Sequence, residues 1–297
     1  MPAALAPPPE LVRPDYNIYY FSDGLFKVVY NKSTAPRVYC LDHSKDQHHD
    51  TKLDSSVSRA RRVVLELGLC NPWKYFCTFT LDQTKYDRTN LKKWHKDFLQ
   101  WLRDQRKKYP ELKFDFLLVP ELHDDKTTWH MHGLFSDITP LLVSFRDLHA
   151  AGVRVPLKLV NSNYLNWTSY QKKFGFCSFG LIRDPVACGF YITKYINKSL
   201  GECLVPVGSS LYYPSRGLNR SVLHGSIYGF CSPLDKYLVN DYDFCKTGFV
   251  KSPEASAWHF GFEYMDHSDL ELFDISDMEC PEVDHYYEVT QQVLEGF

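Results

Sequence analysis

The chain has 297 residues, of which 44% are hydrophobic and 15% aromatic. This length and hydrophobic content allow a substantial buried core, most simply in one large domain or in one domain with extensions. The nine cysteines form no Cys-x-x-Cys pair. Their spacing argues against a zinc finger and a disulfide framework, and it indicates buried thiols in a reducing compartment.

The formal net charge of −2 is unevenly distributed along the chain. All 34 Lys and Arg residues lie within the first 251 positions, whereas twelve Asp and Glu residues follow Lys251. The first 251 residues therefore carry a net charge of +10, and the end of the chain is acidic. A basic body suits a polyanionic partner such as nucleic acid, although an ordinary solvated surface gives the same composition.

The start of the chain, MPAALAPPPE, has neither a basic segment nor an apolar run of useful length, so it does not resemble a signal peptide. No stretch approaches the roughly 20 apolar residues that span a bilayer. We therefore expect a soluble, cytoplasmic protein without a membrane partner.

The chain begins with a proline-rich segment (2–14), and short strands are possible within 16–55. The end of that stretch is a polar loop over 42–56. Arg59, Arg61 and Arg62 open a short helix after it. The aromatic and β-branched run 74–81 predicts a strand. A helix follows, because Asn90 can cap it and apolar residues recur at three- and four-residue spacing from Leu91 to Leu102. Pro110 ends this helix.

The sequence predicts two strands, at 113–119 and 130–135, joined by a polar turn that contains Asp124 and Asp125. A strand at 174–182 and a helix over 185–199 follow. This order predicts an α+β domain with an antiparallel sheet. We place this domain at 59–250, between an N-terminal extension (1–58) and an acidic C-terminal tail (251–297).

Two histidines, His130 and His132, alternate on the second strand of the predicted hairpin. Side chains two residues apart on a strand share a face, so the imidazoles form half of a site for a divalent metal. The hairpin returns Glu121 beside them, and one carboxylate with two imidazoles and open positions suits Mg²⁺ or Mn²⁺ in phosphate chemistry. Gly133 allows a close approach. His123 is the nearest competing ligand, although its turn position favours solvent, and simple packing also explains a His-x-His pair.

Residues 191–198 read Tyr-Ile-Thr-Lys-Tyr-Ile-Asn-Lys, a four-residue unit written twice. On a helix, Tyr191, Lys194, Tyr195 and Lys198 share one face. A nearby cation favours the phenolate, so the stripe has the composition of two activated oxygen nucleophiles. An amphipathic helix with Tyr and Lys at the solvent boundary explains the same pattern.

Phosphate contacts are expected from the basic body, and the candidates are Lys92, Lys93, Arg106, Lys107 and Arg216. The four that follow Asn90 also fit the solvated outer face of a helix. Exposed aromatic residues would stack on unpaired bases.

Three ordered segments resemble the HUH endonucleases, rolling-circle replication initiators named for two histidines separated by a bulky residue. Thr78-Phe79-Thr80 is similar to their first motif, and His130-Met131-His132 with Glu121 is similar to their metal-binding motif. The repeated Tyr-x-x-Lys unit is similar to their two-tyrosine motif, in the form found in the initiators of small single-stranded-DNA phages (microviruses). The resemblance runs from about Trp73 to Lys198.

A further segment, 215–218 (Ser-Arg-Gly-Leu), resembles plasmid- and phage-type initiators, whereas the first 70 residues match nothing. The resemblance implies an antiparallel sheet of about five strands flanked by helices, with the histidines on a central strand that faces the tyrosine helix. It also implies a metal-dependent, site-specific endonuclease and ligase that nicks single-stranded origin DNA.

In that chemistry a tyrosine attacks the phosphate, leaving a 5′-phosphotyrosine and a free 3′-hydroxyl, and the second tyrosine cuts the regenerated origin. The implied partners are single-stranded origin DNA and the replicative helicase and polymerase of a host, in the host cytoplasm if the chain is phage-encoded. The acidic tail has three possible roles: it would mask the basic face, contact a host replication protein, or simply keep the protein soluble.

Three alternatives remain at this point. A relaxase or transposase of the same superfamily would use the same residues on another substrate. A zinc hydrolase built on His-x-His is disfavoured, because no further His-Asp-His cluster follows His132. A non-catalytic DNA-binding protein would form no covalent adduct.

Overall fold

The computed structural model describes residues 14–32, 49–123, 125, 127–196, 210–227, 232–242, 245–251 and 271–273. They fall into two compact units: a larger unit between residues 49 and 220, and a smaller unit formed by residues 14–32 and 221–273. The proline-rich start and most of the polar loop and acidic tail lie outside the described residues. Within the described parts, no helix is long and apolar enough to cross a membrane.

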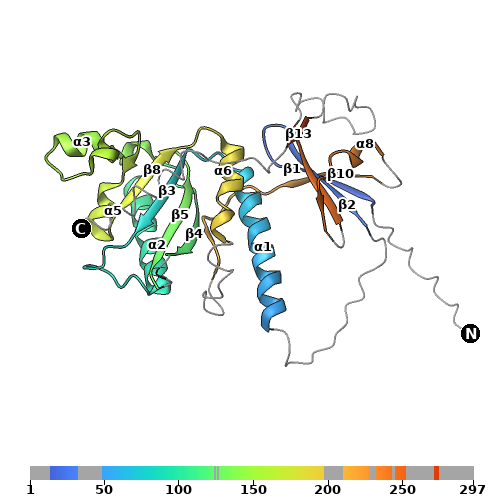
Figure 1. The fold of residues 1–297 in the computed structure, drawn as a ribbon. Helices are drawn as coiled ribbons and strands as arrows, with labels where there is room; N and C mark the ends of the chain where they lie inside the picture. Colours follow the sequence, from blue (N-terminus) through green and yellow to red (C-terminus); the bar gives the residue numbers. More distant parts are fainter. Residues whose placement is uncertain are drawn as a thin grey trace, which may run out of the picture. The chain divides into compact units, whose positions relative to one another are not determined.

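The larger unit is built on a seven-stranded antiparallel sheet in the order β6-β7-β8-β3-β5-β4-β9. Its strands are β3 (Tyr75–Thr80), β4 (Phe116–Leu122), β5 (Trp129–Phe135), β6 (Val143–Ser144), β7 (Leu165–Asn166), β8 (Cys177–Leu181) and β9 (Tyr213–Pro214). Figure 1 labels its central strands β8, β3, β5 and β4. The predicted α+β class with an antiparallel sheet is confirmed, and the sheet is wider than the five strands expected because short strands extend its edges.

The helices of this unit are α1 (His49–Leu69), α2 (Leu91–Lys108), α3 (Phe145–Ala150), α4 (Leu157–Val160), α5 (Thr168–Lys173) and α6 (Pro185–Tyr191), with a 3₁₀ turn at Thr139–Leu141. The predicted cap of α2 is confirmed, since the Asn90 side chain accepts a hydrogen bond from the Lys93 N–H. α1 begins inside the predicted polar loop and is longer than the short helix expected from Arg59 onward.

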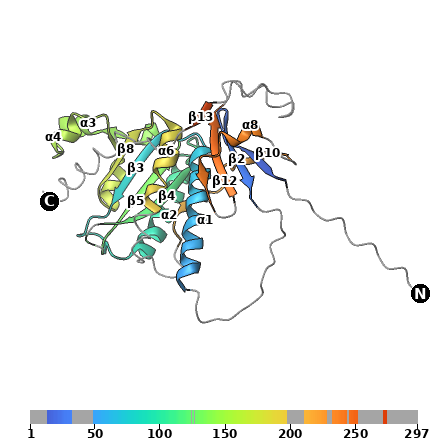
Figure 2. The ribbon, with the colours of Figure 1, turned by 45° about the vertical axis from the view of Figure 1, so that its right-hand side comes forward.

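The two faces of the sheet have different coverings. Met131 and Phe135 of β5 pack with Phe98 of α2, whereas Leu134 packs with residues of α1 and α6. Figure 2 shows α1 and α6 side by side along the sheet. Because strand side chains alternate, the even-numbered residues of β5, including His130 and His132, face α1 and α6.

Gly133 sits where a side chain would not fit. A Cβ atom there would lie 2.9 Å from the Leu117 carbonyl oxygen and 2.6 Å from the Leu118 side chain. The predicted close approach at Gly133 is therefore confirmed, and the neighbouring strand is what approaches it.

Gly175 supports the end of β3, and we expect Gly175→Ala to destabilise the protein by about 2–3 kcal/mol. Its φ is +148°, and a Cβ atom would lie 2.5 Å from the Thr80 carbonyl oxygen and 2.4 Å from the Asp82 nitrogen. Urea unfolding measures the change. Gly152→Ala is the matched control, because Gly152 also has a positive φ (+81°) but nothing within 4 Å of the added atom. Equal losses in the two variants would contradict the expected clash at Thr80.

The smaller unit contains a second antiparallel sheet in the order β10-β1-β2-β12-β11, with β13 also paired to β12. Its elements are β1 (Tyr16–Tyr20), β2 (Leu25–Asn31), β10 (Val222–Ile227), α8 (Ser232–Asp235), β11 (Asn240–Asp241), β12 (Cys245–Lys251) and β13 (Glu271–Phe273). Ile18, Val28 and Val250 pack with Leu234 of α8 in its core. The Tyr16 hydroxyl donates a 2.6 Å hydrogen bond to Asp235.

The observed units differ from the predicted domain boundaries at residues 58 and 250. Strands β1 and β2, which fall in the predicted N-terminal extension, pair with β10 and β12 from the end of the predicted central domain. The physical reason is that strand pairing joins segments about 200 residues apart, and neither segment alone indicates its partner.

Candidate functional site

A ladder of paired side chains crosses the middle of the larger sheet. Thr80 and Thr78 of β3 lie directly opposite His130 and His132 of β5. The threonine hydroxyls contact the Nδ1 atoms of these histidines at 2.9 Å and 3.1 Å, respectively. Each imidazole is thus held through Nδ1, which leaves Nε2 as the atom that other groups contact.

Glu121 joins this ladder from the other neighbouring strand. It lies opposite His130 in the β4–β5 pairing, and its Oε2 contacts the Nε2 of His132 at 2.5 Å. The exposed fractions are 0% for Glu121, 6% for His130 and 3% for His132. The three predicted site residues therefore share one buried face, and a short contact joins two of them.

His130 is held in its neutral form. Burial, helped by the charges of His132, His123 and Arg88, lowers the pKa of His130 to about 3, and the Glu121 charge opposes this shift only in part. The Nε2 atom of His130 is buried and has no hydrogen-bond partner among the described residues.

The chemistry of these side chains fits a divalent cation, because a neutral imidazole with an unused Nε2 is a ready ligand and Glu121 supplies an oxygen. Within the described parts of the chain, no group of three His, Cys, Asp or Glu side chains is arranged to hold a metal ion. Glu121 and His132 contact each other, so each side chain uses on the other an atom that a metal would take.

The neutral His130 predicts a loss of stability in mild acid. The unfolded histidine has its ordinary pKa of about 6.5, so between this value and about 3 the unfolded chain binds more protons than the folded chain. The free energy of unfolding should then fall as the pH drops below 6.5, by up to about 1.4 kcal/mol per pH unit for one group. His95 acts in the same direction, with its pKa lowered to about 4, mainly by burial.

Urea unfolding between pH 7 and pH 4.5 measures this slope. We expect His130→Gln to reduce the slope, whereas the exposed His149→Gln should leave it unchanged. The same slope in wild type and His130→Gln would show that His130 is not held neutral by the fold.

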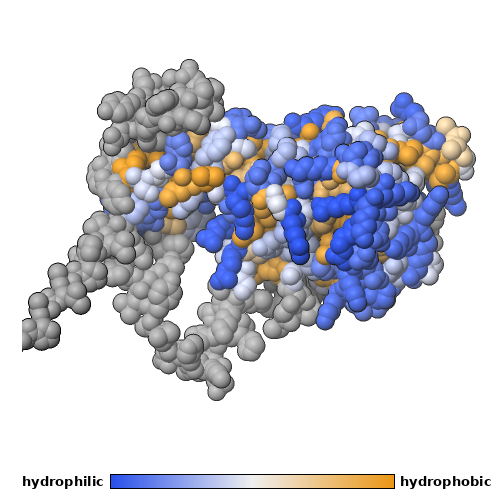
Figure 3. Space-filling view, turned by 180° about the vertical axis from the view of Figure 1, so that it is seen from behind, coloured by the Kyte–Doolittle hydropathy of each residue, from blue (hydrophilic) through white to orange (hydrophobic). Residues whose placement is uncertain are grey.

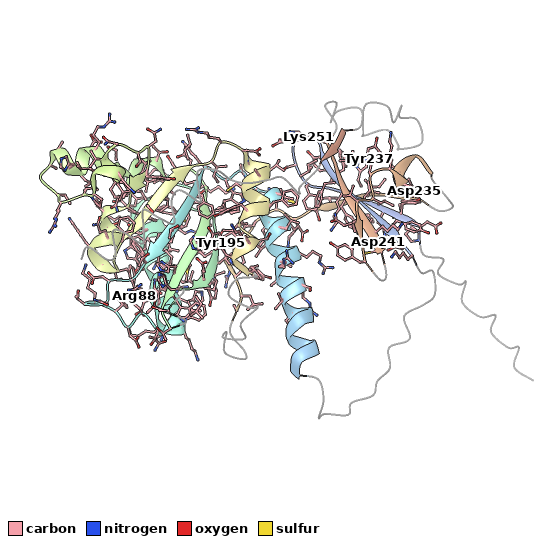
Figure 4. All side chains as sticks on the ribbon, in the orientation of Figure 1. Arg88, Tyr195, Asp235, Tyr237, Asp241 and Lys251 are labelled. Atoms are coloured by element: carbon pink, nitrogen blue, oxygen red, sulfur yellow. The ribbon has the colours of Figure 1, made fainter. Side chains whose placement is uncertain are left out.

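The two tyrosines lie on the same face of the sheet as the histidines. The Tyr195 ring stacks on the His132 ring with centroids 3.8 Å apart and planes 15° apart. The Tyr195 hydroxyl donates a 2.8 Å hydrogen bond to the Tyr191 hydroxyl. Tyr191 is 8% exposed and Tyr195 is 3% exposed, so the pair is nearly buried, with Tyr195 (labelled in Figure 4) covering one face of the His132 ring.

The segment that carries the tyrosines is not the single helix predicted over 185–199. α6 ends at Tyr191, residues 192–193 form a turn, and helical conformation resumes at Lys194. The Thr193 hydroxyl donates to the Phe190 carbonyl at 2.7 Å, and the Thr193 N–H bonds to the same carbonyl. Such a local side-chain bond competes with the regular helical ladder, which explains the interruption.

Of the two lysines predicted beside the tyrosines, Lys194 is described by the structure and Lys198 is not. The Lys194 ammonium lies over the Tyr191 ring, 5.4 Å from its centroid. A cation thus lies near the tyrosine pair, over the ring of Tyr191.

The predicted phosphate-binding residues of α2 are not brought to this face. α2 packs on the opposite side of the sheet through Trp94 and Phe98. There, Lys93 pairs with Asp97 at 2.8 Å, Arg106 donates to the Phe114 carbonyl, and Lys92 and Lys107 are exposed. Arg216 is also exposed, on the segment after β9. Figure 3 shows mostly hydrophilic side chains over the larger unit when it is seen from behind.

Sequence reasoning missed two features of the site. His123 is not simply solvated, because its ring lies 4.9 Å from that of His130 and its side chain is 21% exposed. The threonines were recognised as part of a motif but not as the partners of the histidines. The alternation of Thr78 and Thr80 on a strand was the available signal, since it gives them one face in common with a neighbouring His-x-His pair.

Comparisons with known proteins give one finding. Residues 74–200 match the family model of the replication-associated protein ORF2/G2P. The matched span includes all seven residues predicted for metal binding and catalysis and leaves out the smaller unit. No curated protein and no solved structure matches the chain. The match covers less than half of the chain and is consistent with a rolling-circle replication initiator.

Proposed function

We propose that the chain initiates rolling-circle replication by nicking single-stranded origin DNA through a tyrosine. The observation that carries the proposal is the pair of hydrogen-bonded tyrosine hydroxyls, with one ring stacked on His132, on the face that also holds His130 and Glu121. Two oxygen nucleophiles beside a carboxylate and two imidazoles suit transfer of a phosphodiester to tyrosine.

The metal dependence of this reaction is part of the proposal. Glu121, His130 and His132 would hold Mg²⁺ or Mn²⁺, which when bound supplies Lewis-acid polarisation of a phosphate. Thr78 and Thr80 orient the two imidazoles through Nδ1. The carboxylate of Glu121 has to release the Nε2 of His132 when the metal site forms, because the two atoms now contact each other.

The tyrosine pair supplies the nucleophile. The Tyr191 oxygen bonds to phosphorus while the bond between phosphorus and the 3′ oxygen breaks, so the phenol loses its proton and the 3′ oxygen gains one. The Tyr195 hydroxyl donates to the Tyr191 oxygen, and a donated hydrogen bond favours the phenolate. We therefore infer that Tyr191 attacks first and that Tyr195 supports it.

The burial of the site adds a requirement to the reaction. Tyr195 covers one face of His132, and both tyrosines are almost fully shielded from solvent. Entry of a DNA phosphate therefore requires the segment after α6 to move away from β5. The turn at residues 192–193, which interrupts the helix, is the place where we expect this movement to begin.

The second tyrosine gives the site a use beyond one cut. After one round of synthesis, Tyr195 would cut the regenerated origin while Tyr191 still holds the first 5′ end. The phosphodiester bond energy is kept in the phosphotyrosine link, so rejoining needs no nucleotide cofactor. A polymerase that extends the 3′-hydroxyl and a helicase that unwinds the template are the partners that this cycle requires. A relaxase or transposase would share the chemistry and differ in the DNA that it cuts.

The test uses the full chain and labelled oligonucleotides tiled along both strands of the DNA molecule that encodes it. With Mn²⁺ or Mg²⁺, we expect a labelled protein band that survives denaturation, for single-stranded oligonucleotides from one region only. Chelation of the metal should remove the band. The absence of any such band with either metal and every oligonucleotide would refute the proposed nicking activity.

A further inference from the structure

The loop between β3 and α2 borders the candidate site and carries Arg88 (Figure 4). β3 ends at Thr80, the partner of His130, and the chain then runs through this loop to Asn90, the cap of α2. The backbone carbonyl of Arg88 accepts a 3.1 Å hydrogen bond from the Trp129 N–H. Arg88 is therefore tied to the first residue of β5, next to His130.

The Arg88 side chain has donors that the fold leaves unused. Its Nε atom is buried and has no hydrogen-bond partner, and no described residue forms an ion pair with its guanidinium. Its charge is close enough to act on His130. Arg88 as a whole is half-buried, but a buried donor such as its Nε normally meets an acceptor, because an unpaired buried donor is costly.

The neighbouring carboxylates do not fill this role because other groups occupy them. The Asp87 carboxylate accepts from the Thr89 N–H and hydroxyl at 2.9 Å and 2.6 Å. The Asp125 carboxylate, on the turn before β5, accepts from the N–H of Thr127 and from the N–H and hydroxyl of Thr128. Arg88 thus remains the uncompensated cation of these two loops among the described residues.

We propose that Arg88 binds non-bridging oxygens of a phosphate of the single-stranded DNA, on the side of the site where His130 lies. The planar guanidinium presents paired donors that match a phosphate, and such charge-assisted bonds are stronger than neutral ones. The inference rests on the proposed function, because it places the DNA phosphate at the same site. It assigns to Arg88 the anion-binding role that the sequence had suggested for residues of α2.

The first measurement compares Arg88→Gln and Arg88→Lys with wild type in the covalent reaction on the cleaved oligonucleotide. We expect Arg88→Gln to form the adduct about 10- to 100-fold more slowly, which is the loss expected for a hydrogen bond to a charged group. Arg88→Lys keeps the charge without the paired donors, so its rate should lie between the two. Arg146→Gln removes an exposed arginine from α3 and should react as wild type does.

The second measurement identifies the phosphate and does not depend on cleavage. Each phosphate of the oligonucleotide is replaced in turn by a neutral methylphosphonate, and binding is followed by fluorescence anisotropy. At one phosphate, the replacement should weaken wild type but not Arg88→Gln. The salt dependence of binding should also fall by about 0.7 in log–log slope for Arg88→Gln, as expected for one lost contact to a single strand.

The outcomes separate the two proposals. An adduct that forms equally fast in wild type and Arg88→Gln, with the same sensitivity at every phosphate, would overturn the role of Arg88 and leave the nicking activity intact. If wild type forms no adduct, but replacing one phosphate weakens binding by wild type and not by Arg88→Gln, the contact is supported and the proposed function is refuted. Circular dichroism checks that each variant is folded. If Arg88→Gln does not fold, the same comparisons are made between wild type and Arg88→Lys.

Discussion

Replacement of both Tyr191 and Tyr195 by phenylalanine is expected to abolish covalent attachment of the protein to single-stranded DNA. The double variant keeps both aromatic rings, including the stacking partner of His132, and removes only the two hydroxyls that contact each other. Neither of the two proposed phenol nucleophiles then remains. Denaturing gels with labelled DNA measure the adduct.

The single variants test the order of the two tyrosines. In Tyr195→Phe, the Tyr191 oxygen loses the hydrogen bond that it accepts, and we expect the reaction to slow by about 10- to 100-fold. Tyr191→Phe should be slower still, because only the more deeply buried phenol is left. Tyr109→Phe, at the end of α2 on the opposite face of the sheet, is the control and should react normally. A double variant that still forms the adduct would mean that another residue is the nucleophile.

The second large effect is expected from Glu121→Gln. The substitution keeps the size of the buried side chain and removes the charge that meets His132 and that would bind the metal. Loss of one metal ligand should lower the rate of adduct formation by about 100- to 1000-fold, since metal-ion stabilisation of a transition state is worth several kcal/mol. The metal concentration needed for half of the maximal rate should rise as well.

Glu111→Gln is the matched control, because Glu111 is exposed and precedes β4. Its adduct rate and metal dependence should equal those of wild type. If Glu121→Gln reacts at the wild-type rate at every Mn²⁺ concentration, Glu121 is not a ligand and serves only to hold His132.

Much of the larger unit follows from local sequence patterns. The aromatic run at 75–80 and the spacing of apolar residues from Leu91 to Leu102 predict β3 and α2 correctly, because alternation and helical periodicity are local properties. The hairpin of β4 and β5 was also predicted, together with the placement of Glu121 beside the histidines.

The remaining features depend on contacts between distant segments. β1 and β2 pair with strands that follow residue 221. The sequence pattern of neither the early nor the late strands indicates which strand is the partner. The break after Tyr191 depends on the Thr193 hydroxyl and its bond to the Phe190 carbonyl, which competes with a helical pattern that is regular in the sequence. The role that we propose for Arg88 could not be predicted from the sequence for a similar reason, since the Trp129 hydrogen bond that ties its loop to β5 is not local.

The most direct test of the proposed nicking activity is to identify the residue that carries the DNA. Trypsin cleaves after Arg183, Lys194 and Lys198, so it separates Tyr191 and Tyr195 into two different peptides. After nuclease digestion of the adduct, mass spectrometry should find a nucleotide on the peptide 184–194 in early samples and also on 195–198 when synthesis is allowed to continue. A nucleotide on any other peptide, or on neither, would contradict a tyrosine pair acting beside Glu121, His130 and His132.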